Sequence, residues 1–201
     1  MRRLIINADD FGLTAGVNRA IVEAHERGVV SSATLMANGQ AFDEAVKLAG
    51  SRPRLGVGCH IVLVDGTPLV RDAATRTLLD GGSAGAPRFR EGIARFAALA
   101  LLGRLAPDEI EAEATAQIRK LQSAGIAVTH LDSHKHTHMF PQVFRPLLRA
   151  AKACGVTAIR NPFERIRAAE VASRPALWQR WAEEIIKSST RRKLGWNIIW
   201  E

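Results

Sequence analysis

Short apolar runs alternate along the chain with segments whose apolar residues recur every three to four positions. Runs of this kind, bounded by turn residues, are typical of buried parallel strands, because both faces of such a sheet are covered. Each run is followed within two residues by an acid, an asparagine or an arginine. Strands are predicted over residues 4–8, 29–37, 55–63, 126–131 and 156–159.

Helical periodicity fills the intervals between these runs. After the first run, Thr14 is suited to cap a helix, an apolar stripe follows, and Gly28 is placed to end it. Further helices are predicted over residues 41–48, 93–105, 107–123, 142–153 and 176–187. Strands that alternate with helices indicate an α/β fold with a parallel sheet, and residues 1–201 are expected to form a single domain.

Residues 65–92 interrupt this alternation. The segment is rich in glycine and proline, including Gly66, Pro68, the pair Gly81-Gly82 and Pro87. A loop of this length in a compact domain is often a lid over a site or a disordered segment. The sequence leaves its role open.

The composition is that of an ordinary globular protein, with 47% of the 201 residues hydrophobic. No run of 18 apolar residues occurs, and Asp9 and Asp10 follow the short apolar start of the chain. Neither a membrane span nor a secretory signal is expected, so the protein is expected to be cytoplasmic. Cys59 and Cys154 are expected to be reduced packing residues.

The net charge of +8 is uneven along the chain. Residues 151–201 carry ten Lys or Arg against five Asp or Glu, and they include all four tryptophans. Basic residues with tryptophan suit an anionic membrane surface or a nucleic acid. A solvated face with core aromatics is the preferred interpretation, so no nucleic-acid partner is expected. Peripheral contact with the inner membrane surface is the alternative.

The segment from His130 to Phe140 carries the clearest chemical signal. Four clustered imidazoles would repel one another if charged, whereas a divalent cation binds them in the neutral form. Side chains two apart on a strand lie about 7 Å apart, but a metal holds imidazole nitrogens at about 2.1 Å. One straight strand therefore supplies one or two ligands. In any extended part, one face would carry His130, Asp132, His134, His136, His138 and Phe140.

Polar side chains also follow the other predicted strands. Asp9 and Asp10 end the first strand, His60 lies near the end of the third, and Arg160 follows the fifth. The carboxyl ends of parallel strands form the edge at which (β/α) barrels and open α/β sheets place their active sites. We therefore expect these side chains to lie close to the histidine-rich segment.

Together these residues predict a catalytic metal site with oxygen and nitrogen ligands. Asp10 and His60 would bind the metal with one or two of His134, His136 and His138, which leaves room for water. The other carboxylate of the acidic pair would serve as general base. Asp132 would orient a histidine ligand or accept a hydrogen bond from the backbone.

Three sequence blocks carry a family resemblance. They are residues 7–12 (Asn-Ala-Asp-Asp-Phe-Gly), 58–60 (Gly-Cys-His) and 129–141 (Thr-His-Leu-Asp-Ser-His-Lys-His-Thr-His-Met-Phe-Pro). By these blocks, about residues 2–162 resemble the YdjC-like carbohydrate deacetylase family. The segment from Ala176 is most similar to its hopanoid-biosynthesis-associated branch. The resemblance implies a (β/α) barrel-like fold and removal of the N-acetyl group from an amino sugar, with a lipid-linked (hopanoid) N-acetylglucosamine as the finer expectation.

The resemblance also implies residue roles. Asp9 would be the catalytic base, and Mg²⁺ or Zn²⁺ would be held by Asp10, His60 and His134. The sugar site would be lined by His136, His138 and Arg160. Family members continue past this length with further strands and a late histidine block. We therefore expect a domain shortened at its C-terminus and an incomplete barrel-like sheet.

Two other functions stay open at this point. One is a metal-dependent phosphoesterase, in which Lys135 or Arg160 would hold the phosphate and two metals would be expected. The other is an inactive fragment whose basic end binds a membrane surface. A homo-oligomer is compatible with the deacetylase function and with both of these alternatives.

Overall fold

A computed structural model of the protein describes residues 4–70, 76–80 and 86–161. Four strands form one parallel sheet whose order in space follows the sequence. Ser32 pairs with both Asn7 and Gly56, and Cys59 pairs with Leu131. The α/β fold with a parallel sheet is therefore confirmed. The strands are β1 (Asn7–Phe11), β2 (Ser32–Leu35), β3 (Gly56–Ile61) and β4 (Leu131–Ser133).

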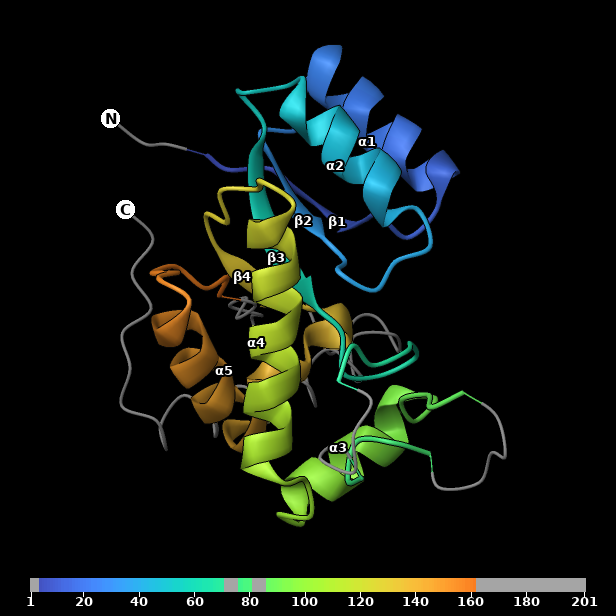
Figure 1. Ribbon diagram of the computed structural model, residues 1–201, viewed down its shortest axis with the longest axis vertical. Helices are drawn as coiled ribbons and strands as arrows, with labels where there is room; N and C mark the ends of the chain where they lie inside the picture. Colours follow the sequence, from blue (N-terminus) through green and yellow to red (C-terminus); the bar gives the residue numbers. More distant parts are fainter. Residues whose placement is uncertain (1–3, 71–75, 81–85, 162–201) are drawn as a thin grey trace, which may run out of the picture.

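Five α-helices connect and cover these strands within the described residues. They are α1 (Ala15–Glu26), α2 (Phe42–Gly50), α3 (Ile93–Leu101), α4 (Pro107–Ser123) and α5 (Pro141–Ala153). In Figure 1, α1 lies beside α2 at the end of the sheet formed by β1, while α4 runs beside α5. The predicted cap is present, because Thr14 Oγ1 accepts a hydrogen bond of 3.2 Å from the Val17 amide.

The core lies between the sheet and the helices. Every residue of β2 is buried, which explains why its sequence lacks the alternation of a half-exposed strand. From the helix side, Ile118 and Leu121 of α4 and Leu147 of α5 are fully buried. These apolar contacts hold the strand ends, and the polar side chains on them, in fixed positions.

The predicted fifth strand is reduced to a single bridge in the structure. Ile159 forms one isolated parallel bridge with Leu131, supported by backbone hydrogen bonds from Leu131 to Ala158 and from Arg160 to Leu131. The physical reason is the register, because Ile159 lies opposite Leu131, the first residue of the three-residue strand β4, and residues 156–158 lie opposite positions that precede it. A neighbouring strand has too little β4 edge to pair with, yet the bridge still brings Arg160 to the strand ends.

The segment after β3 is attached to α4 by polar side chains on one face of that helix. These side chains are spaced four residues apart, so they share a face. Each accepts hydrogen bonds of 2.7–3.0 Å from backbone amides of the segment. The pairs are Gln117 with Val62, Glu113 with Leu69 and Val70, and Glu109 with Thr77.

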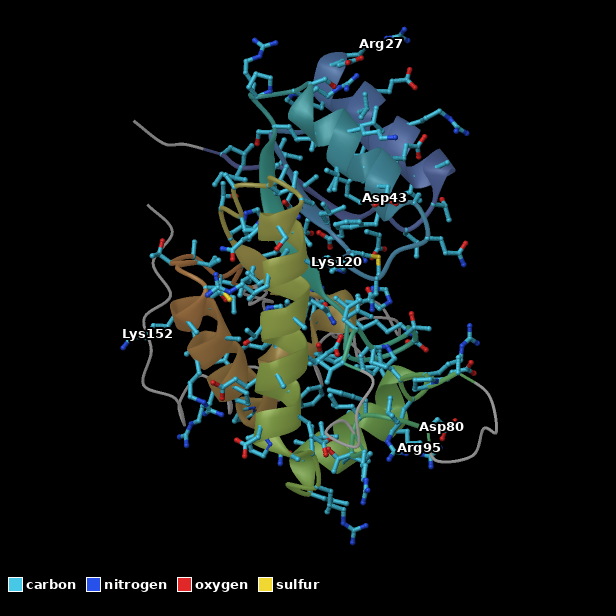
Figure 2. The ribbon with its side chains drawn as sticks, viewed as in Figure 1. Arg27, Asp43, Asp80, Arg95, Lys120 and Lys152 are labelled. Carbon is cyan, nitrogen blue, oxygen red and sulfur yellow. The ribbon has the colours of Figure 1, made fainter. Side chains whose placement is uncertain are left out.

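Charged side chains project from the outside of the fold. In Figure 2, Arg27 at the C-terminal end of α1 and Lys152 on α5 point away from the fold, and Arg27, Asp43 and Lys152 are all exposed. Within the described ranges, no helix is long and apolar enough to cross a membrane. The helix predicted over residues 176–187 and all four tryptophans lie outside those ranges.

Candidate metal centre and active site

The paired acids lie at a one-residue β-bulge in β1. Ala8 pairs with Ala33 and Phe11 with Leu35, so three steps along β1 match two along β2. Asp10 occupies the left-handed region with φ of 63°. Successive side chains of a regular strand would point to opposite faces. At the bulge, Asp9 and Asp10 each bring a carboxylate oxygen within 4.8 Å of a ring nitrogen of His60.

The turn after the bulge is fixed by a buried asparagine. Gly12 has φ of 88°, a conformation that favours glycine. Its amide donates a 2.7 Å hydrogen bond to Oδ1 of Asn18 in α1, and the Asn18 amide group donates to the Ala41 carbonyl at 3.1 Å. The bulged end of β1 is thereby joined to both α1 and the start of α2.

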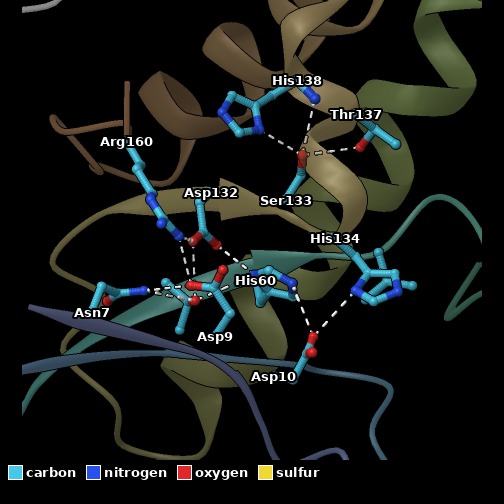
Figure 3. Close-up of polar contacts among 12 residues, drawn as sticks. Asn7, Asp9, Asp10, His60, Asp132, Ser133, His134, Thr137, His138 and Arg160 are labelled. Carbon is cyan, nitrogen blue, oxygen red and sulfur yellow. Dashed lines mark hydrogen bonds and ion pairs between the residues drawn. The ribbon is translucent and has the colours of Figure 1, made fainter. Parts of the chain in front are cut away.

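Asp10, His60 and His134 converge at the carboxyl ends of β1, β3 and β4. Asp10 Oδ1 lies 3.2 Å from His60 Nε2 and 3.1 Å from His134 Nδ1, as Figure 3 shows. Ligand atoms that surround a tetrahedral metal at about 2.1 Å lie about 3.4 Å apart. The spacing and the mixed oxygen and nitrogen donors therefore fit a divalent cation such as Mg²⁺ or Zn²⁺, with a further coordination position for water or substrate.

The ring of His60 is oriented from behind by Asp132. His60 Nδ1 donates a 2.6 Å hydrogen bond to Asp132 Oδ1, which leaves Nε2 directed at Asp10. Thr34 Oγ1 donates to the second Asp132 oxygen at 3.1 Å. A carboxylate behind an imidazole is the usual arrangement for a metal-binding histidine, because it fixes the tautomer and makes the ligand nitrogen more basic.

The electrostatics of the group follow from these contacts. Burial lowers the pKa of His60, but the hydrogen bonds to Asp10 and Asp132 outweigh it and raise that pKa to about 9. Hydrogen bonds from His134 and His60 hold the pKa of Asp10 well below its usual range. Without a metal, a proton on His60 links two carboxylates. A cation bound to Nε2 would replace that proton.

Asp9 belongs to a neighbouring polar group centred on Arg160. The Arg160 guanidinium donates to Asp9 Oδ1 at 2.6 Å and to Asp132 Oδ2 at 3.2 Å. Asn7 Nδ2 also donates to Asp9 Oδ1 at 2.8 Å. Within the described residues, the guanidinium and the amide therefore both donate to the same oxygen of Asp9, Oδ1.

The histidine-rich segment leaves the strand direction at His134. Lys135 and His136 have left-handed φ values of 52°, so residues His134–Met139 (η2) form short 3₁₀ turns interrupted by a kink and not one regular helix. The shared face expected from the alternation therefore applies only to His130 and Asp132, because the extended part ends at Ser133. This turn carries the His134 ring toward Asp10.

A buried serine holds this turn. Ser133 Oγ accepts hydrogen bonds of 3.0 Å from Thr137 Oγ1 and 2.9 Å from the His138 amide, and it lies 2.6 Å from His138 Nδ1 (Figure 3). His138 is 2% exposed, and burial lowers its pKa to about 4. The half-buried His136 ring meets the His138 ring edge-on. Among the described residues, neither joins the converging aspartate and histidine ligand atoms.

Exposure divides the site into a front and a back. The side chains of Asp9 and Asp10 are 34% exposed, and that of Arg160 is 30% exposed. The side chains of His60 and Asp132 are only 3% and 1% exposed. A bound molecule can therefore reach the acidic pair and Arg160, while His60 and Asp132 support them from inside.

Sequence reasoning missed three supporting residues. Thr34, Asn7 and Ser133 all donate or accept hydrogen bonds within the site. Thr34 offered a signal, because it is a polar residue inside an apolar run predicted to be a buried strand. Asn7 and Ser133 lie next to recognised site residues, but their contacts depend on the bulge and on the 3₁₀ turn.

The fold and the site together define an α/β protein with a parallel sheet and an aspartate–histidine site at the carboxyl ends of its strands. Comparison with known protein families and proteins identifies the family within this class. The chain belongs to the YdjC-like protein family, whose model matches residues 3–197. It is 44% identical over 150 residues to a carbohydrate deacetylase from Brevibacillus brevis, an alignment that covers 75% of this chain and 56% of that protein.

A solved structure supports the fold. It comes from Enterococcus faecalis V583 and is provisionally described as a cellobiose-phosphate cleavage protein. The similarity has a TM-score of 0.68 and 30% sequence identity, and it covers 88% of this chain and 64% of that protein. The chain thus spans less than two thirds of the length of each of these two proteins.

Proposed function

We propose that the protein is a metal-dependent hydrolase that removes the acetyl group from an N-acetylated amino sugar. The observation that carries this proposal is the convergence of Asp10, His60 and His134 on one point, with Asp9 beside it. A divalent cation held there would polarise the acetamide carbonyl and make a water molecule more acidic. Family membership and the deacetylase relative supply the substrate class.

Asp9 is the proposed general base. Arg160 and Asn7 hold one oxygen of Asp9, while its partial exposure lets the other oxygen reach a water molecule at the site. Asp9 would accept a proton from that water as the water oxygen bonds to the acetamide carbon. When the carbon–nitrogen bond breaks, the same carboxyl group can return the proton to the leaving amine, which balances the hydrolysis.

The other side chains of the site would bind and orient the sugar. Arg160 is partly exposed beside Asp9, so its guanidinium can donate to a sugar hydroxyl or to the acetamide oxygen. His136 and His138 are proposed to line the same region. Because His138 is buried, within this proposal it would support the inner surface of the sugar site and would not lie at its entrance.

The finer proposal is a lipid-linked substrate of the hopanoid type. Its support is the sequence of residues 151–201, where the net charge is +5 and all four tryptophans occur. Such a segment suits peripheral contact with an anionic inner membrane surface. Sedimentation with anionic liposomes tests this part separately, and a chain that stays in the supernatant at low salt would contradict it.

Acetate release from N-acetylglucosamine oligomers by the metal-loaded chain tests the main proposal. Asp9→Asn should keep the metal and lower kcat about 10²–10⁴-fold, because it removes the base but no ligand. His134→Ala should lose metal binding and activity together. Asp80→Asn makes the same change of charge as Asp9→Asn, but in an exposed ion pair, and serves as its control. Phosphate release from phosphate esters without acetate release would favour the phosphoesterase instead.

A further inference from the structure

We infer that the Arg160 guanidinium occupies a potential second metal site formed by Asp9, His60 and Asp132, and that it thereby restricts the proposed centre to a single metal ion. The inference rests on the proposed metal centre and adds a property of it. Removing the guanidinium should let a second divalent cation bind between Asp9 and Asp132.

Two sets of potential ligand atoms meet at His60. Asp10, His60 and His134 form the first set, and Asp9, His60 and Asp132 form the second. In each set the ligand atoms lie within 4.8 Å of one another. Two-metal hydrolases place their ions about 3.5–4 Å apart. The carboxylates of this site are thus numerous and close enough for a second ion.

The second set already holds a positive charge. One guanidinium nitrogen of Arg160 lies 2.6 Å from Asp9 Oδ1 and 3.2 Å from Asp132 Oδ2, so it bridges the two carboxylates (Figure 3). The Arg160 amide also donates a 2.8 Å backbone hydrogen bond to Leu131. Because the backbone is fixed beside the first residue of β4, the guanidinium is held where a second cation would otherwise bind.

Charge balance favours one ion with Arg160 in place. Asp9, Asp10 and Asp132 contribute three negative charges, and Arg160 contributes one positive charge. One dication with neutral histidines brings this total to zero, whereas a second would leave two positive charges in a half-buried site. Uncompensated charge away from water is strongly unfavourable.

His60 provides a further reason for one ion. Its Nδ1 donates to Asp132 while its Nε2 faces Asp10. Both ring nitrogens of His60 therefore already have partners, and a second ion would have only Asp9 and Asp132 as ligands. Arg160 occupies the position between these two carboxylates and would have to move away first. The side chain of Arg160 is 30% exposed, so it can be replaced without opening a cavity in the core.

The test counts Mn²⁺ ions bound to the full chain by equilibrium dialysis and examines their magnetic coupling by electron paramagnetic resonance. We expect one isolated Mn²⁺ per wild-type chain and two coupled ions per Arg160→Met chain. Arg160→Gln, a second neutral variant, should also bind two ions, while Arg160→Lys retains the charge and should bind one. Adding Asp9→Asn to Arg160→Met should remove the second ion and keep the first.

Arg95→Met is the matched control, because Arg95 forms an exposed ion pair with Asp80 away from the site. It should bind one ion. If both folded neutral variants at position 160 bind one Mn²⁺ with wild-type affinity, the inference is wrong and the proposed metal centre stands. If the wild-type chain binds no Mn²⁺, Mg²⁺ or Zn²⁺, the proposed centre is wrong and the inference is overturned with it.

Discussion

Asp132 contacts three groups that each determine part of the site geometry. Its oxygens accept hydrogen bonds from His60 at 2.6 Å, from Thr34 at 3.1 Å and from Arg160 at 3.2 Å. Burial is the largest single influence and raises the pKa of Asp132, but the hydrogen bond from His60 together with the positive charges of His60, His138 and Arg160 lowers the pKa overall. The carboxylate is therefore ionised, and its negative charge stabilises the orientation of the His60 ring.

Asp132→Asn should weaken metal binding by about 10–100-fold, because the variant loses the charge that orients a ligand while all three proposed ligands remain. Calorimetric titration with Zn²⁺ measures the change in Kd. Asp80→Asn removes the same charge from an exposed pair and should leave Kd unchanged. Equal affinities in the two variants would show that Asp132 does not support the metal.

His138 should make the stability of the metal-free protein depend on pH. Burial lowers its pKa in the folded chain to about 4 from the usual value of 6.5, although Asp132 acts in the opposite direction. The unfolded chain therefore takes up this proton first, and the free energy of unfolding should fall as the pH decreases from about 6.5 to about 4.

Urea unfolding at about pH 7 and about pH 5 tests this expectation. His138→Gln removes the titrating group and should reduce the loss of stability between the two pH values, whatever its effect on stability at pH 7. If wild type and variant lose equal free energy over this interval, His138 does not titrate as the structure indicates.

Sequence reasoning placed the site residues at strand ends but could not give their directions. Asp10, His60 and His134 come together because parallel strands end at the same edge, a rule that needs no coordinates. The bulge at Asp10 was not predictable, since its φ of 63° depends on pairing with β2. The burial of His138 follows from the 3₁₀ turn, which the alternating sequence concealed.

At the scale of elements, α4 both covers the sheet and holds the segment after β3. Its buried carboxylate, Glu113, is fully shielded from solvent and accepts hydrogen bonds from Leu69, Val70 and Gln117. A charged group without such donors would be costly to bury. The helix therefore fixes the start of the segment whose role the sequence left open.

Glu113→Ala should lower the free energy of unfolding by about 3 kcal/mol, because three donors lose their acceptor. Urea denaturation measures this change. Glu111→Ala on the same helix removes an exposed ion pair with Arg149 and should cost less than about 1 kcal/mol. Similar losses in the two variants would mean that solvent replaces the buried contacts.

The long periodic elements were predictable, and the short ones were not. The helices that begin at Pro107 and near Thr14 match the prediction closely, because a capping residue or a proline marks each start. The strands β2, β3 and β4 are shorter than the apolar runs that predicted them, and residues 156–159 form only a bridge. The first strand lies three residues later than predicted, so Asp9 and Asp10 lie within β1 and do not follow it. Pairing length depends on the neighbouring strand, which a single run of sequence does not contain.

For the molecule as a whole, the structure confirms the predicted α/β class and the parallel sheet. The single domain, the incomplete barrel and the role of the basic C-terminal quarter stay predictions. Among the described residues, the strand order follows the sequence, as expected where consecutive strands are neighbours.

The separation of Asp10 and His134 by 124 positions has a kinetic consequence. The proposed ligands meet only after β1, β3 and β4 have paired, and such non-local contacts are late events in folding. A metal should therefore leave the folding rate unchanged and slow unfolding. At about 100 times Kd, where binding stabilises by about 2.7 kcal/mol, unfolding should be about 100-fold slower in stopped-flow measurements. Acceleration of folding by the metal would instead place these strands together in the transition state, and the ion would then act as a nucleus for the sheet.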